Sequence, residues 1–98
     1  MYGLIVKLTI LPGMRDEAIV LLREGAQDMP GCSGYVIAKD AADENVLWVT
    51  EVWESEASHD ASFTLRAVQE VAPRIRLLVA NVEKLAVTEP VVDAARPG

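Results

Sequence analysis

The chain has 98 residues, a length that makes one small domain and excludes a multidomain enzyme. Its residues are 51% hydrophobic and 24% charged, which excludes intrinsic disorder because a packed core can form, and a formal net charge of −6 excludes a general binder of nucleic-acid backbones. One cysteine and one histidine exclude an internal disulfide and a structural zinc site, and no apolar run is long enough to span a bilayer, so we expect a soluble, cytoplasmic protein without a membrane partner.

The first part of the chain predicts a strand followed by a helix. Residues 2–11 are rich in branched apolar side chains and end at the turn signal Pro12-Gly13, which is typical of a strand. From residue 14 the apolar residues recur every three or four positions, with charged residues between them. This spacing predicts an amphipathic helix over residues 14–28 that Pro30-Gly31 ends.

The middle of the chain predicts a hairpin and a second helix. Residues 34–40 and 46–53 read as antiparallel strands joined by a polar turn. Ser55 is a suitable N-cap, and helical spacing of apolar residues continues to Ala72. Pro73 clashes with the preceding helical turn, so we expect a break or kink there, followed by a short second helix or a bent continuation.

The last elements complete a known topology. Residues 81–88 predict a final strand, and residues 89–98 a tail that is mobile or crosses to a partner. The domain therefore spans residues 1–88. The order strand, helix, strand, strand, helix, strand predicts an α+β, ferredoxin-like βαββαβ fold, in which both helices cover one face of a four-stranded antiparallel sheet.

The alternation of side chains indicates that both faces of this sheet are apolar. In residues 46–53, Val46, Trp48 and Val52 lie opposite Leu47, Val49 and Trp53. Helices on one side cover only one face, and an apolar face left in water is unfavourable. The pattern therefore predicts a homodimer in which two sheets pack face to face.

Two segments carry a family resemblance. The turn PGCSGY over residues 30–35, followed by Asp40, and the stretch TEVWESEASHDAS over residues 50–62 resemble the antibiotic biosynthesis monooxygenase family of dimeric α+β barrels. The resemblance covers about residues 1–88. It implies a small cofactor-independent oxygenase that uses molecular oxygen to convert phenol, hydroquinone or anthrone-type aromatic substrates to quinones.

The same fold also hosts other activities, which keeps alternatives open. One alternative is an isomerase that transfers protons on a small carbonyl compound and consumes no oxygen. Another is a non-enzymatic ligand-binding dimer. Haem-degrading relatives use an asparagine in the first strand and a histidine nine positions after the tryptophan. This chain has Lys7 and no asparagine in that strand, and Ser62 nine positions after Trp53, which disfavours haem.

An oxygenase of this kind needs an apolar cavity, a base and a group that stabilises an anion. The resemblance implies that Trp53 lines the substrate pocket, although large aromatic residues also serve as ordinary core. Glu51 shares a face with Trp53 and is a candidate acid or base, with a surface ion pair as the alternative. His59 follows on the next helix and is the only side chain that ordinarily titrates near neutral pH.

Three further residues complete the candidate site. Tyr35 begins the second strand and is able to hydrogen-bond a substrate oxygen or to serve as a half-buried strand residue. Arg74 and Arg76 are candidates for stabilising an enolate, or are solvated helix charges. Cys32 is interpreted as a small packed residue, because no basic side chain lies close to it in sequence. No metal or cofactor is expected.

Overall fold

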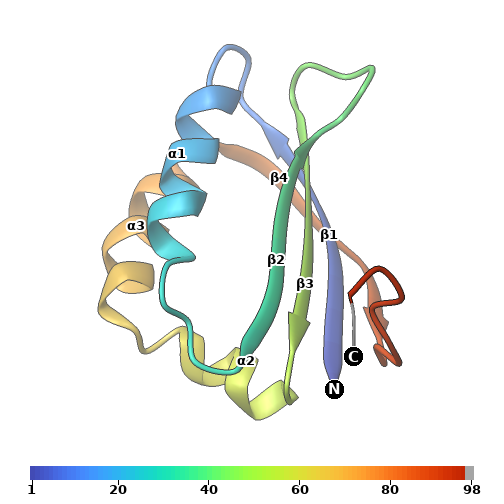
Figure 1. Ribbon diagram of the computed structural model, residues 1–98. Helices are drawn as coiled ribbons and strands as arrows, with labels where there is room; N and C mark the ends of the chain where they lie inside the picture. The colour runs from blue at the N-terminus through green and yellow to red at the C-terminus, as the bar shows by residue number, and fades with distance from the viewer. Residues whose placement is uncertain (97–98) are drawn as a thin grey trace.

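The structure, a computed structural model, describes residues 1–96 and places four strands and three helices among them. The strands are β1 (Tyr2–Ile10), β2 (Cys32–Lys39), β3 (Val46–Trp53) and β4 (Val79–Thr88). The helices are α1 (Arg15–Gly25), α2 (Glu56–Ser62) and α3 (Arg66–Arg76). All neighbouring strands are antiparallel, in the order β2-β3-β1-β4. Figure 1 shows the helices on one side of the sheet, so the predicted ferredoxin-like α+β fold is confirmed.

Element boundaries differ from the sequence prediction mainly at turns. The predicted bounds of β3 are correct, whereas β2 and β4 each begin two residues earlier than expected. Helix α1 ends at Gly25, three residues before the predicted end at residue 28. Asp28 has a φ of 52°, in the left-handed region that a continuing right-handed helix does not use. The chain therefore leaves the helix before the proline that was expected to end it.

Of the alternatives expected at Pro73, a break is wrong, and the helix continues through the proline. Pro73 lies inside α3, which continues to Arg76. The second helical segment is instead divided ahead of it, where the amide of Thr64 donates to Ala61 O and the amide of Leu65 donates to Ser62 O. Leu65 then has an extended backbone, with φ −68° and ψ 138°, before α3 begins. This tight turn separates α2 from α3, so the helices number three rather than two.

The core lies between the helices and the covered face of the sheet. Leu8 and Ile10 of β1 and Leu47 and Val49 of β3 are buried beneath the helices. Further buried positions come from the helices and their ends: Ala18, Leu21, Val71 and Leu78. The core is thus concentrated toward α1 and α3, which leaves the β4 side of the covered face less filled.

The opposite, open face of the sheet carries the C-terminal tail. Figure 1 shows the described tail residues beyond β4 on the side of the sheet away from the helices. Gly3 of β1 permits this approach, because a Cβ at Gly3 would lie 3.0 Å from Pro90 Cγ and would clash with Thr88. The predicted tail includes residues 97–98, which lie outside the described residues.

Candidate active site

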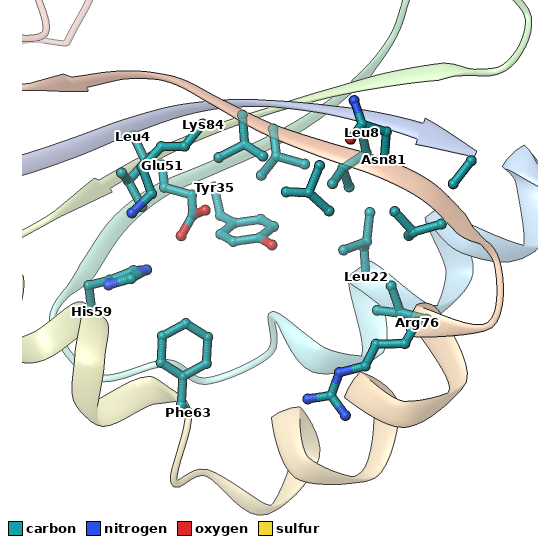
Figure 2. A pocket seen from close by; sticks show the side chains of 16 residues that line it. Leu4, Leu8, Leu22, Tyr35, Glu51, His59, Phe63, Arg76, Asn81 and Lys84 are labelled. Carbon is teal, nitrogen blue, oxygen red and sulfur yellow. The ribbon is translucent and has the colours of Figure 1, made fainter.

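A cavity of about 610 Å³ lies between the covered face and the helices. Its apolar walls come from β1, β3, β4, α1 and α3. Figure 2 shows Tyr35, Glu51 and His59 directed toward its open centre, with Phe63 facing the sheet from the helical side. The fold therefore brings four of the predicted site residues into one cavity, because Arg76 lines it as well.

His59 is fixed by α2 and by the aromatic rings around it. Ser55 caps α2 by accepting the amide of Ser58 at 3.1 Å, as its sequence position predicts. The His59 ring centroid lies 5.5 Å from those of Tyr2 and Trp53 and 5.1 Å from that of Phe63. These ring contacts hold the imidazole at the cavity wall.

The two ring nitrogens of His59 have different surroundings. Nδ1 lies 3.0 Å from Asp60 Oδ1. Figure 2 shows the far ring nitrogen pointing toward the cavity. In the tautomer that donates Nδ1–H to Asp60, Nε2 is a free proton acceptor facing the cavity.

Glu51 and Trp53 form a pair on the covered face of β3. The indole Nε1 of Trp53 donates to Glu51 Oε1 at 3.0 Å, and the indole is 1% exposed. Trp53 is not one of the residues that line the cavity, whereas Glu51 is. The indole therefore lies behind the carboxylate, orients it and contacts His59 from the same side.

Tyr35 lies beside Glu51 in the register of β2 and β3. Burial raises the pKa of the Tyr35 hydroxyl well above its usual range, and the negative charge of Glu51 raises the pKa further. The hydroxyl thus stays protonated at neutral pH. It can donate a hydrogen bond to an oxygen atom inside the cavity.

The two arginines of α3 occupy different places. Arg76 lines the cavity, whereas Arg74 Nη1 lies 3.7 Å from Glu24 Oε2 on the helical surface and is not part of the lining. Cys32 is partly buried at the start of β2, where desolvation raises the pKa of its thiol. A thiol with a raised pKa is a poor nucleophile, in agreement with its interpretation as a packed residue.

Two cavity residues outside the predicted site are Phe63 and Lys84. Phe63 fits the helical spacing of apolar residues that continues to Ala72, but it lies just after α2 and lines the cavity while 59% exposed. Lys84 of β4 also lines the cavity. Since side chains two positions apart share a strand face, its spacing from Val82 was the available signal. The spacing alone does not say which face of the sheet this is. The register does, because it pairs Lys84 with Val6, which also lines the cavity.

Within residues 1–96, no group of three or more His, Cys, Asp or Glu side chains is placed to hold a metal ion. No helix in this part of the chain is long and apolar enough to cross a membrane.

A ferredoxin-like sheet whose covered face and helices border an apolar cavity with a few polar groups defines the class as a small α+β protein. The sequence profile of the antibiotic biosynthesis monooxygenase family matches residues 1–74, and the chain belongs to this family. No functionally curated protein matches it.

Solved structures agree with this assignment. A protein from Chloroflexus aurantiacus J-10-fl that is named for the antibiotic biosynthesis monooxygenases is 45% identical, with a TM-score of 0.92 and 96% of each chain covered. A Nitrosomonas europaea protein named for the same family is 14% identical, with a TM-score of 0.83 and coverage of 94% of this chain and 100% of the other. A Mycobacterium tuberculosis protein is 19% identical, with a TM-score of 0.76 and coverage of 96% and 98%. The last two similarities concern the fold alone.

Proposed function

We propose that the protein is a cofactor-independent monooxygenase that oxidises a small phenol, hydroquinone or anthrone-type substrate with molecular oxygen. The observation that carries the proposal is the placement of His59 and Glu51 at the wall of an otherwise largely apolar cavity of about 610 Å³. The cavity accepts aromatic rings, His59 supplies proton transfer, and Glu51 supplies a hydrogen-bond acceptor. We place this activity in the cytoplasm.

The proposed base is His59. Its Nε2 removes a proton from a phenol oxygen or an activated methylene carbon of the substrate, while Asp60 accepts the Nδ1–H and stabilises the imidazolium that forms. Tyr35 donates its hydroxyl proton in a hydrogen bond to the developing oxyanion. Glu51, oriented by Trp53, accepts a hydrogen bond from a second substrate hydroxyl.

The anthrone-type reaction balances without an external reductant. The deprotonated methylene carbon gives one electron to dioxygen, and the resulting carbon radical and superoxide combine to form a C–O bond. Protonation gives a hydroperoxide at that carbon. Cleavage of the O–O bond with loss of the remaining C–H proton releases water and leaves a carbonyl, so CH₂ plus O₂ becomes C=O plus H₂O. The substrate supplies all four electrons.

The proposal includes a homodimer. The open face carries Val36, which is 59% exposed, together with Ile5 and Val52, and in one subunit only the tail lies over this face. A second copy packed sheet to sheet would remove this apolar area from water. The cavity lies on the other face, so such a dimer leaves both cavities accessible.

Oxygen uptake tests the function. We expect uptake with members of an anthrone and hydroquinone panel, and a kcat about 100-fold lower in His59→Ala, the typical loss of a general base. Trp48→Phe is the control for a ring substitution outside the cavity, because Trp48 lies on the open face and not in the cavity lining. We expect it to leave oxygen uptake unchanged. Unchanged uptake in His59→Ala contradicts the site assignment. Substrate proton exchange without uptake indicates the isomerase, and ligand binding without either reaction indicates a binding protein.

A further inference from the structure

The charges that line the cavity are unlike those of the whole chain. Glu51 contributes one negative charge, and Arg76 and Lys84 contribute two positive charges, so the lining carries a net +1 with His59 neutral. The complete chain carries −6. The cavity is therefore a locally cationic site in an acidic protein, which favours an anionic ligand over a neutral or cationic one.

Arg76 is free to bind such an anion. Its neighbours on α3 are engaged in ion pairs: Arg66 Nε lies 3.0 Å from Glu70 Oε1, and Arg74 Nη1 lies 3.7 Å from Glu24 Oε2. Within residues 1–96, no carboxylate lies within 4.0 Å of the Arg76 side-chain nitrogens. A guanidinium that lines a cavity without such a partner retains its paired N–H donors for a ligand carboxylate.

The position of Arg76 separates it from the proposed base. Figure 2 shows its guanidinium at the opposite end of the cavity from His59 and Glu51. Arg76 also lines a second, smaller cavity of about 240 Å³ between α1 and α3, which shares Leu22, Tyr35 and Ile75 with the first. The guanidinium of Arg76, where the two cavities meet, lies across an apolar region from His59, the proposed base. It therefore suits a permanent anionic substituent rather than the transient oxyanion near His59.

We propose that the ligand of this cavity is an aromatic carboxylate, and that Arg76 binds its carboxylate while the hydroxylated ring lies toward His59. The inference rests on the proposed function for the orientation of the ring. It goes beyond that function by naming an acidic substituent and the residue that selects for it. Bidentate pairing of guanidinium with carboxylate supplies both affinity and a fixed direction of entry.

The test is calorimetric binding of a matched pair, 2,5-dihydroxybenzoate and 2,5-dihydroxybenzamide, under anaerobic conditions that prevent turnover. We expect the acid to bind about fivefold more tightly than the amide, as for a partly exposed ion pair. Arg76→Gln removes this preference. Arg23→Gln, which deletes the same charge from an exposed position of α1 outside the cavity, keeps it. Added salt reduces the preference in the natural chain.

Three outcomes overturn the inference. The acid and the amide bind equally, neither of them binds, or Arg23→Gln loses the preference for the acid as Arg76→Gln does. Oxygen uptake then separates the inference from the proposed function. Uptake with neutral substrates and no preference for the acid preserves the function and removes the inference. A preference for the acid that depends on Arg76, without oxygen uptake by any substrate, preserves the inference and removes the oxygenase.

Discussion

The two faces of the sheet carry the same type of pair in different settings. On the covered face the indole of Trp53 donates to Glu51 at 3.0 Å, and on the open face that of Trp48 donates to Asp40 at 2.8 Å. Trp53 is buried by the helices, whereas Trp48 is only partly buried and has Lys7 Nζ 5.9 Å from its ring centroid. The covered face packs against the helices and holds the Glu51 carboxylate at the cavity. On the open face the indole of Trp48 also has its hydrogen-bond partner, but apolar side chains such as Val36 remain exposed.

Truncating one apolar side chain on each face gives the largest expected difference in the free energy of unfolding. Leu47 is 0% exposed, so Leu47→Ala is expected to lower the free energy of unfolding by about 2–5 kcal/mol through lost contacts and a cavity. Val36→Ala is expected to lower the unfolding free energy of a dilute, monomeric sample by less than about 1 kcal/mol, because Val36 is mostly exposed. Urea denaturation monitored by circular dichroism measures both. Equal losses would remove the distinction between the faces.

A charge on the open face tests whether a partner covers it. Val36→Asp is expected to weaken the homodimer roughly 100-fold or more, because an unpaired carboxylate would be buried between the sheets. Sedimentation equilibrium measures the dissociation constant. Leu77→Asp is the control, since Leu77 is 76% exposed at the end of α3 and away from the sheet. A natural chain that stays monomeric at micromolar concentration would contradict the dimer.

Removing each indole N–H compares the two pairs directly. Trp53→Phe leaves the half-buried Glu51 without its donor and is expected to cost about 1–3 kcal/mol of unfolding free energy. Trp48→Phe is expected to cost about 1 kcal/mol or less, because Asp40 keeps the backbone amides of Ala42 and Asp43. Chemical denaturation measures both losses. A larger loss of unfolding free energy in Trp48→Phe than in Trp53→Phe would contradict the view that the pair on the covered face contributes more to stability.

The smallest expected effect is a change in the titration of Asp40. Hydrogen bonds from the Asp43 amide, the Trp48 indole and the Ala42 amide lower its pKa from 3.8 to about 2. A pKa lowered by folding contributes stability above the unfolded value, and this contribution is lost as the pH falls from about 4 to about 2. In Trp48→Phe we expect the pKa to rise toward its ordinary value. Carbon NMR of the carboxyl group measures it, and an unchanged pKa would show that the backbone amides suffice.

Elements with a strong periodic pattern were predictable from the sequence, and the turns between them were not. The bounds of β3 follow from branched and aromatic residues between polar turns. The division between α2 and α3 depends on the hydrogen bonds around Thr64 and Leu65, which leave no periodic signal. Pro73 left a break and a bent continuation open, and only the structure shows that the proline is accommodated inside α3.

The candidate site was predictable only in part for a similar reason. The spacing of Glu51 and Trp53 placed them on one strand face, and strand geometry alone determines this. The location of Arg76 in the cavity lining and of Arg74 outside it depends on how α3 packs against α1, which the sequence does not state. Lys84 required the register of β4 with β1. Long-range packing therefore determines which charged side chains line the cavity.

Gly25, the last residue of α1, links the packing of two helices to the shape of the site. A Cβ there would lie 2.7 Å from Val71 Cγ2 of α3, and the stiff side chain of valine cannot turn far from it. A single added methyl group would thus separate the two helices. Since Ile75 and Arg76 belong to α3, that separation would displace them relative to Tyr35. The shape of the cavity can accordingly be changed from between the two helices, without exchanging any residue that lines it.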